Sequence, residues 1–432
     1  MEKYKVSTID DLSPELINSL IERFKLKELK RLQRLQEYYN ANTDIKQRTM
    51  SDESKPNNMI STSYPQYLTN TINAFFLGKP VSYISSVDEL MDRVQPILDD
   101  NHEQTLNSRI GKSISITGVG YELAYVDEQT QLKFVYLDPT EAFMIYDNTI
   151  QSNPIAAVRF FEVEDYLTNE NQLFVELYTK DYVQSFKQDK EGLVKVAEPQ
   201  VHYLKEVPVN VYFNNDEATG DYEKVIDLIN AYELSISDQA NSYAYFSDAY
   251  LMVTGAELDE TDFDNLKEQR LMVLPQGASA DFLVKQTDYL SMREYQERLK
   301  NDIHALSFTP DLQSETFGNA SGESLKYKLF GLESYVSIKE AMMRHSLENR
   351  LKIIVNYLNI KGGSFNSSEI TMNFTRNLPP HLESIAALIK QLDGIVSRST
   401  LLQLLPFIQD VNFEKELLEM EKQGIEYTNF SE

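Results

Sequence analysis

Few groups of residues in this sequence have the types and spacing that phosphate binding requires. The segment from Gly318 to Ser324 comes nearest to a phosphate-binding loop. It lacks the Lys-Ser/Thr ending that reaches the β- and γ-phosphates of a nucleotide, and acidic Glu323 stands in that place. The pair Gly118 and Gly120 has no third glycine for a dinucleotide fingerprint, and no strand clearly precedes it. Neither segment therefore indicates a nucleotide site.

Acidic residues and histidines also form no recognisable metal or catalytic site. The cluster from Glu257 to Asp264 lacks the central glycine and closing glutamate of an EF-hand, so we interpret it as a charged helix start. Low-affinity cation binding between subunits stays open. No Gly-x-Ser-x-Gly, His-Glu-x-x-His or kinase signature occurs. The histidines are scattered, never at i, i+4 spacing, and are expected to be structural: His102, His202, His304, His345 and His381. The sequence predicts no enzyme, no metal and no cofactor.

The composition narrows the class of partner. The 432 residues carry 67 acidic and 41 basic side chains, a net charge of −26, and no cysteine. No apolar run reaches the length of a transmembrane helix, so we expect a soluble intracellular product with no membrane partner. A protein that grips nucleic acid needs a basic stripe to neutralise phosphates. The charge therefore argues against holding DNA, but an acidic wall is compatible with DNA that passes through a channel.

The main basic cluster lies on the first predicted helix, for which Ser13 is the N-cap and Pro14 the first residue. A solvated helix face is favoured over a phosphate contact because the patch is small and confined to one helix. The cluster comprises Lys25, Lys27, Lys30, Arg31 and Arg34.

Apolar periodicity predicts an α+β protein. Helices are expected at 64–77, 87–99 and 103–116, and Gly78 is expected to end the first of these as its C′ residue. Between Tyr121 and Phe213 the period changes to two, and the segments rich in Tyr and Phe predict an antiparallel β region. The strand-like segments are 132–137, 156–161, 173–178 and 209–213.

Two long helices follow, one opening at Gly220-Asp221 and one from Asp288 to Leu306. The acidic residues of the first helix are expected to lie mostly on its outer surface. The helices bracket an α/β insertion, with strands at 250–253, 271–274 and 281–284 and a short helix near 261–269. Their narrow apolar stripes fit either an antiparallel hairpin in one core or staves packed against copies in a ring. The residues alone leave both open.

A polar, glycine-containing loop from Ser307 to Gly322 leads into the longest helical pattern, Glu323 to Ile360, with Ser321 as the expected N-cap. Gly331 costs about 1 kcal/mol against alanine inside a helix and is the expected bend. Such a loop on a long, bent helix suggests a mechanical part more than a catalytic one. A strand at 370–375 and helices at 381–396, 398–405 and 412–423 complete the pattern.

The run from Asp311 to Glu333 resembles the portal (head–tail connector) proteins of tailed bacteriophages, in the branch found in siphoviruses of Gram-positive hosts. Other landmarks agree and follow the expected order, so that the resemblance covers most of the chain. They are Leu77–Val81, Pro208–Asn215, Gly220–Glu223 and Asn373–Pro379.

The resemblance implies a ring, typically of twelve subunits, at one capsid vertex. The ring would be a channel for terminase-driven packaging and ejection of double-stranded DNA, and the platform for head–tail connection. Implied partners are further copies of the chain, the passing duplex, the terminase large subunit, a head-completion adaptor, and the major capsid and scaffolding proteins. The protein would be made in the bacterial cytoplasm and carried in the virion.

The resemblance also implies a division of the chain. The expected parts are a wing at 1–220, stem helix 1 at 221–247, a small α/β clip at 248–287, stem helix 2 at 288–306, a tunnel loop at 307–322, a long bent wing helix with a strand at 323–379, and a short helical crown at 380–432.

The implied functional residues lie in the tunnel loop. We hypothesise steric and weakly polar contact with the duplex from Gln313, Ser314, Glu315, Thr316, Phe317, Asn319 and Ser321, and a hinge at Gly331. Phe317 could equally be a packing anchor, and Gly331 only a packing gap. The alternative class is an acidic homo-oligomeric scaffold or adaptor without DNA translocation, and an unrecognised carboxylate-dependent hydrolase ranks third.

Overall fold

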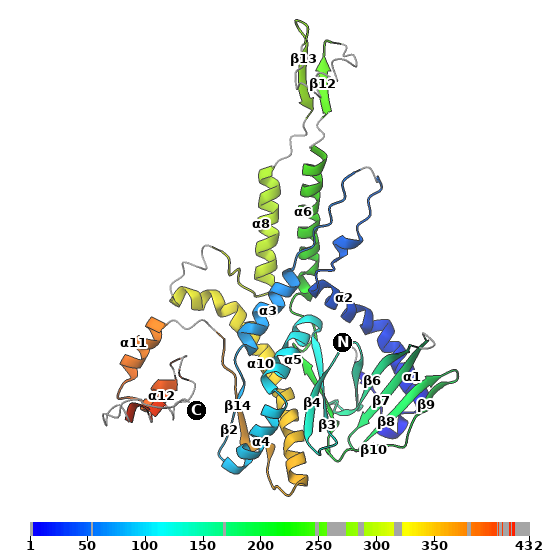
Figure 1. The fold of residues 1–432 in the computed structure, drawn as a ribbon, viewed down its shortest axis with the longest axis vertical. Coiled ribbons are helices and arrows are strands. Elements are labelled where there is room, and N and C mark those ends of the chain that lie inside the picture. Colours follow the sequence, from blue (N-terminus) through cyan, green and yellow to red (C-terminus); the bar gives the residue numbers. More distant parts are fainter. Residues whose placement is uncertain are drawn as a thin grey trace. The chain divides into compact units, whose positions relative to one another are not determined.

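The computed structural model describes residues 3–52, 55–166, 170–246, 250–256, 274–283, 289–314, 322–377, 382–403, 405, 408, 414–415 and 417–419. The chain divides into two compact units. The first comprises Met1–Pro310 and Leu332–Thr375, and the second comprises Asp311–Gly331 and Arg376–Glu432. The first unit mixes helices and sheets, which confirms the predicted α+β class (Figure 1).

The largest sheet has seven strands in the order β1-β5-β6-β7-β8-β10, with β9 paired to β8. Its pairings are antiparallel apart from the parallel pair β1–β5, so the predicted antiparallel β region is confirmed. The bounds are β1 Tyr4–Lys5, β5 Ala142–Tyr146, β6 Pro154–Asp165, β7 Glu170–Thr179, β8 Tyr182–Asp189, β9 Gly192–Lys195 and β10 Gln200–Val201. Periodicity located β6 and β7 but not the other five strands.

A second sheet has the order β11-β3-β4. The bounds of β4, Leu132–Leu137, and β11, Val209–Phe213, agree with the predicted segments, whereas β3, Val119–Val126, was not predicted. Helix α5, Glu103–Thr117, contacts all three strands. The Asn101 side chain closes the free edge of β4, because it accepts from the Phe134 N–H at 2.7 Å and donates to the Leu132 carbonyl at 3.0 Å. Capping of this kind satisfies edge groups that could otherwise pair with another chain.

The expected first helix is interrupted. Ser13 caps α1, Pro14–Phe24, by accepting from the Leu16 N–H at 3.3 Å, as predicted. A π-helical turn, Lys25–Leu29, then separates α1 from α2, Lys30–Tyr39. Phe24 is fully buried against the largest sheet, where its ring lies 5.4 Å from that of Phe143.

The basic cluster on these helices is partly neutralised within the chain. Arg31 pairs with Glu223 at 2.5 Å, and Arg34 pairs with Asp44 at 2.8 Å. Lys25 lies 3.5 Å from Glu22. The charges of Arg31 and Arg34 therefore serve tertiary contacts, and half-buried Arg31 differs in this from the predicted solvated face. The choice against a phosphate contact stays a prediction.

The first long helix starts later than predicted. A 3-10 turn at Glu223–Val225 precedes α6, Ile226–Phe246, and Asp221 lies before both. The expected outward position of its acidic residues is wrong for Asp221 and Glu233, which are buried. The physical reason is that each carboxylate has hydrogen-bond donors from other segments, described below for Asp221.

The donors of Glu233 come from the polar segment 41–63, which runs beside α6 (Figure 1). Thr62 donates to Glu233 through its N–H at 2.6 Å and its hydroxyl at 2.8 Å, and the Thr43 hydroxyl donates as well. Further along α6, the Ile60 N–H donates to Ser237 at 3.0 Å and the Asn58 N–H donates to the Asn241 side chain at 2.6 Å. Hydrogen bonds therefore fasten this polar segment along α6.

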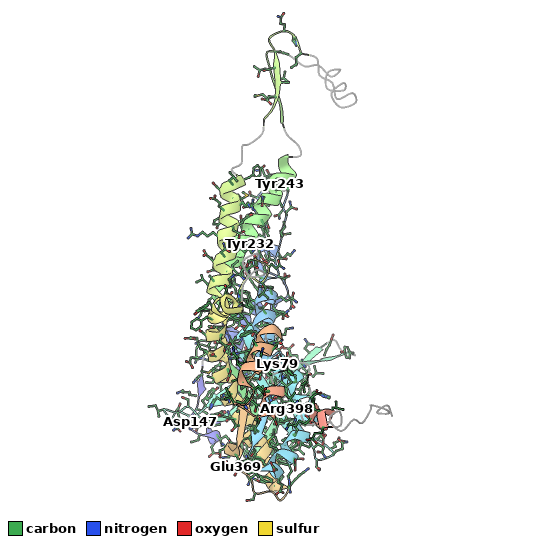
Figure 2. All side chains as sticks on the ribbon, turned by 90° about the vertical axis from the view of Figure 1, so that its left-hand side faces the viewer. Lys79, Asp147, Tyr232, Tyr243, Glu369 and Arg398 are labelled. Carbon is green, nitrogen blue, oxygen red and sulfur yellow. The ribbon has the colours of Figure 1, made fainter. Side chains whose placement is uncertain are left out.

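Helix α8, Tyr289–Leu306, lies beside α6 and runs antiparallel to it (Figure 1). The Gln296 side chain donates to Ser235 at 3.2 Å and to Gln239 at 3.1 Å. Tyr243, labelled near the end of α6 in Figure 2, stacks on Tyr289 at 6.0 Å. The hairpin arrangement is thus present within one chain, and it leaves the stave arrangement untested.

Of the predicted insertion, the structure describes a hairpin of β12, Tyr250–Thr254, and β13, Ser279–Leu283. Most of it, including the acidic cluster, the helix near 261–269 and the strand segment 271–273, lies outside the described residues.

The remaining elements follow the predicted order with adjusted bounds. Helix α3, Tyr64–Leu77, ends at Gly78 as expected, but with φ −70°, so Gly78 is not in the left-handed conformation. Helices α4, Asp88–Asp100, and α5 match their predictions closely. Strand β14, Ile370–Asn373, pairs with the unpredicted β2, Ser82–Ser85. In the second unit α11 spans Leu382–Leu392 and α12 spans Arg398–Gln403, while most of 412–423 lies outside the description.

Helix α10, Gly322–Ile360, is the longest element and belongs to both units. Among the helices that the structure describes, none is long and apolar enough to cross a membrane. The same residues contain no group of three or more His, Asp or Glu side chains placed to hold a metal ion.

Candidate functional site

The described part of the predicted tunnel loop begins on a rigid anchor at the end of α8. Thr309 is buried, and its N–H donates to the His304 carbonyl at 3.1 Å. The His304 ring in turn lies 3.0 Å, through Nδ1, from the Thr309 carbonyl and meets the rings of Tyr64 and Tyr67 edge-on. The Tyr67 hydroxyl donates to the Pro310 carbonyl at 3.3 Å. His304 is therefore structural, as predicted, and fastens the start of the loop to α3.

Phe308 connects this anchor to α10. Its ring is half exposed and stacks on Tyr335 with a centroid separation of 5.4 Å and an interplanar angle of 7°. Its φ is +56°, a conformation that costs a non-glycine residue energy and that tertiary contacts must maintain. The stacking on Tyr335 is such a contact.

The structure describes two of the seven predicted loop residues. Gln313 is exposed, and its N–H donates to the Asp311 carboxylate at 3.0 Å. The Ser314 hydroxyl donates to the Asp311 carbonyl at 3.0 Å, so Asp311 brings both residues into one turn. Glu315, Thr316, Phe317, Asn319 and Ser321 lie outside the described residues. The proposed contact with DNA therefore stays a prediction.

A buried charge pair joins α10 to the start of the α6 segment. Lys339 Nζ lies 2.9 Å from Asp221 Oδ2, with 1% and 0% of the two side chains exposed. Lys339 also donates to the Ser115 hydroxyl at 2.7 Å. Tyr335 and Asn214 donate to Asp221 Oδ1 at 2.7 Å and 2.8 Å. The charge pair thus ties α10, α5 and the residues before α6 to one point.

Burial makes this point sensitive to the loss of either partner. Burial lowers the pKa of Lys339, and Asp221 opposes this by favouring the ammonium form. The pKa of Tyr335 is raised by burial and by the charge of Asp221. A charge left alone at such a depth has no water to solvate it, so removal of one partner is far more costly than exchange of both for apolar groups.

A second buried charge network fixes α10 three turns further on. Arg350 Nη2 lies 2.6 Å from Glu122 Oε1 on β3, and Arg350 Nη1 lies 3.3 Å from Glu103 Oε1 on α5. Tyr212 and Tyr83 donate to Glu122 and Glu103 at 2.7 Å and 2.5 Å. Burial, opposed by Arg350, raises the pKa of Glu103. Together the two networks hold the part of α10 that lies in the first unit.

The predicted hinge falls at the boundary of that part. Helix α10 passes through Gly331 without interruption, and Gly331 is its last residue in the second unit. Exposed and buried residues alternate on both sides of the glycine. Tyr327 and Phe330 are exposed and Leu329 is buried before it, and Leu332 is buried and Ile338 exposed after it. The structure places Gly331 at the boundary between the two units, and motion at this position stays a prediction.

Sequence reasoning missed Lys339, Asp221 and Arg350, although one signal was present. The apolar stripe of α10 has a seven-residue gap between Val336 and Met343, and Lys339 fills the helical position in that gap. A charged residue on a buried stripe needs a partner. The partner itself could not be found, because Asp221 is more than a hundred residues away.

Comparison with known proteins bears directly on the class. The family model described as "Phage portal protein, SPP1 Gp6-like" matches residues 19–428. The portal protein of Bacillus phage SPP1 is 25% identical over 421 residues, which covers 90% of this chain and 83% of that protein. The portal protein of Clostridium phage phiCD119 is 22% identical over 453 residues, which covers 97% of this chain and 99% of that protein.

Because the match spans nearly the whole chain, the protein belongs to the SPP1 Gp6-like family of phage portal proteins. This confirms the predicted resemblance, including its Gram-positive phage branch. The family is structural and non-enzymatic, and its members are virion components at a capsid vertex.

The buried Lys339–Asp221 pair predicts a large and specific loss of stability. Lys339→Met should lower the free energy of unfolding by about 3–5 kcal/mol, because Asp221 is left buried without a counter-charge. The matched control is Lys352→Met on the same helix, where an exposed pair with Glu206 at 2.7 Å is worth about 0–1 kcal/mol. Urea unfolding followed by circular dichroism measures both. If both variants lose the same free energy of unfolding, then Lys339 does not stabilise the buried charge of Asp221.

Proposed function

We propose that copies of this chain close into a ring, of twelve subunits, that forms a channel for double-stranded DNA at the capsid vertex. The ring serves terminase-driven packaging and later ejection, and joins the head to the tail. Its partners are further copies of itself, the passing duplex, the terminase large subunit, a head-completion adaptor, and the major capsid and scaffolding proteins. The protein is made in the cytoplasm of the host. The single observation that carries this proposal is the family match over residues 19–428.

The exposed apolar residues of the α6–α8 pair support packing against further copies. Leu299 and Ile303 are buried in the pair, yet Leu290 and Leu306 keep 75% and 61% of their surface in water. The other large apolar residues exposed on the two helices are Leu234, Tyr243, Tyr289 and Tyr295. Burial of exposed apolar surface favours association. Packing as staves would bury them.

The charge of the chain supports passage of DNA without tight binding. Each copy carries a net charge of −26, and twelve copies would carry roughly 300 negative charges. A duplex held by few basic contacts has no deep electrostatic minimum along its path. The ring therefore acts as a low-friction conduit.

The parts of the chain take the following proposed roles. Residues 1–220 form the wing, with 323–379 as its long helix and strand. Residues 221–247 and 288–306 are the stem helices, and 248–287 the clip that faces terminase and then the adaptor. Residues 307–322 are the tunnel loop, and 380–432 a short crown.

The tunnel loop touches the duplex through mostly neutral side chains, which contact phosphates and grooves without locking onto them. Gln313 and Ser314 lie at its base, on the turn organised by Asp311. Because His304 and Tyr67 hold the start of the loop, force on its tip is passed to α8 and α3.

Substitution of the loop should separate assembly from packaging. Phe317→Ala with Asn319→Ala is expected to reduce the DNA packaged per procapsid while ring assembly stays normal. The measurement is nuclease-protected DNA in procapsids that carry the variant. Ser7→Ala with Ser51→Ala, in exposed positions of the first unit, is the control. Normal packaging by the loop variant would remove the loop from the translocation mechanism.

The hinge at Gly331 lets the start of α10 move with the loop while the part from Leu332 onward stays fixed by Lys339 and Arg350. Gly331→Ala should stiffen the helix, because alanine favours helix by about 1 kcal/mol. We expect slower packaging and poorer retention of DNA. The control Ser337→Ala lies on the fixed part of the helix and is exposed. If Gly331→Ala packages and retains DNA normally, the glycine only fills a packing gap.

A further inference from the structure

A surface pocket with two cations lies where α5, α2 and β4 meet. Arg109 lies over the ring of Tyr136 at 4.5 Å, and Lys112 lies over the ring of Tyr39 at 4.4 Å. We call these four residues and their surroundings the basic pocket. The other lining residues are Gln36, Asn40, Ser113, Ile116 and Asp138. The aromatic rings restrict both cations, which lowers the entropy lost when an anion binds between them.

The two cations of the basic pocket have no counter-ion in their own chain, as far as the described residues show. Neither Arg109 nor Lys112 forms an ion pair there, although the chain carries 67 acidic side chains. The one carboxylate of the pocket, Asp138, is already engaged by the Gln36 amide at 3.1 Å and the Thr140 hydroxyl at 2.7 Å. The pocket is therefore suited to a carboxylate supplied from elsewhere.

A matching group of carboxylates lies on the β6–β7 hairpin. Strand β5 pairs with β6 only as far as Arg159, and β8 pairs with β7 only from Phe174 onward. In the described part of the sheet, residues 162–165 and 170–173 therefore pair only with each other. We call this two-stranded ribbon the acidic arm. A two-stranded ribbon without a covering layer is only marginally stable in water.

Two of the carboxylates of the acidic arm, Glu162 and Glu164, lie on one face of the ribbon. Glu162 and Glu164 are two residues apart on β6 and so point to the same side, and both are exposed. Glu162 accepts from the Asn171 side chain at 3.2 Å through one carboxylate oxygen. Tyr166, the residue directly after β6, has 85% of its surface exposed. Val163 on the other side is exposed as well. The arm thus combines two carboxylates with an aromatic ring, and the basic pocket combines two cations with two aromatic rings.

We propose that the acidic arm of one copy binds in the basic pocket of a neighbouring copy, with Glu162 and Glu164 paired to Arg109 and Lys112. The backbone spacings are comparable, because residues at i and i+2 of a strand are about 6.8 Å apart along the chain and the Cβ atoms at i and i+3 of a helix are about 5–6 Å apart. This inference rests on the proposed ring and names one contact within it.

The absence of cysteine allows a direct test. One chain carries Lys112→Cys and a second chain carries Glu164→Cys. When the two chains are co-expressed and mildly oxidised, they should form a disulfide-linked dimer that is visible on a non-reducing gel. One chain that carries both substitutions should form a ladder of higher multiples. Each single variant alone should give little dimer. The control pair is Glu164→Cys with Lys195→Cys, whose cysteine lies on β9 at an exposed position.

Charge reversal gives the second readout. Arg109→Glu with Lys112→Glu, and separately Glu162→Lys with Glu164→Lys, should each raise the subunit concentration for half assembly about tenfold, as for close interfacial charge pairs. A variant that combines all four substitutions should again reach half assembly near the wild-type subunit concentration, because the reversed charges attract each other. Exposed positions keep the folding risk low, and circular dichroism checks it.

Three results would overturn the inference. If rings form but the chains with Lys112→Cys and Glu164→Cys are not cross-linked, this contact is excluded, whereas the proposed ring is still supported. Charge-reversed variants that assemble like the wild type would do the same, as expected if the pocket instead bound duplex phosphates. A wild-type chain that never oligomerises would remove the proposed ring and this contact together, and size measurement distinguishes that case.

Discussion

The structure depends most on a lysine and an aspartate that have both been removed from water. Lys339 and Asp221 are 2.9 Å apart with almost no exposed surface, so neither charge is tolerable without the other. Because Asp221 precedes α6, Lys339 lies on α10 and Ser115 lies on α5, the requirement to keep the pair together fixes three elements in one arrangement. An apolar contact could slide by a turn at modest cost, whereas this pair specifies one register. The Arg350 network does the same further along α10.

This arrangement explains why a structural protein of this family has a long helix that belongs to two units. From Leu332 onward α10 is held by buried charges and apolar contacts, whereas its first turns belong to the second unit with the predicted loop. At the N-terminal end of the loop, His304 and Thr309 are buried and hydrogen-bonded to each other. The start of the loop is therefore fastened in the first unit, and the helix that follows the loop crosses from the second unit into the first at Gly331.

Sequence patterns predicted the elements better than their contacts. Strands β4 and β11 were located to the residue because both are rich in β-branched and aromatic residues. Strand β3 was missed because its first six residues are all buried and show no alternation. The class followed from short motifs near the loop, since those matched a known family. The buried charge pairs join residues more than a hundred positions apart, and no local pattern carries that information.

The central claim is that identical chains surround an axis, with the exposed faces of α6 and α8 buried between neighbours. Electron microscopy of the purified protein, combined with mass measurement, tests it most directly. The account predicts a closed ring with an axial opening of duplex width, roughly 20 Å or more, because B-form DNA must pass without unwinding. A protein that stays monomeric under all conditions, or an assembly without an axial opening, would contradict it.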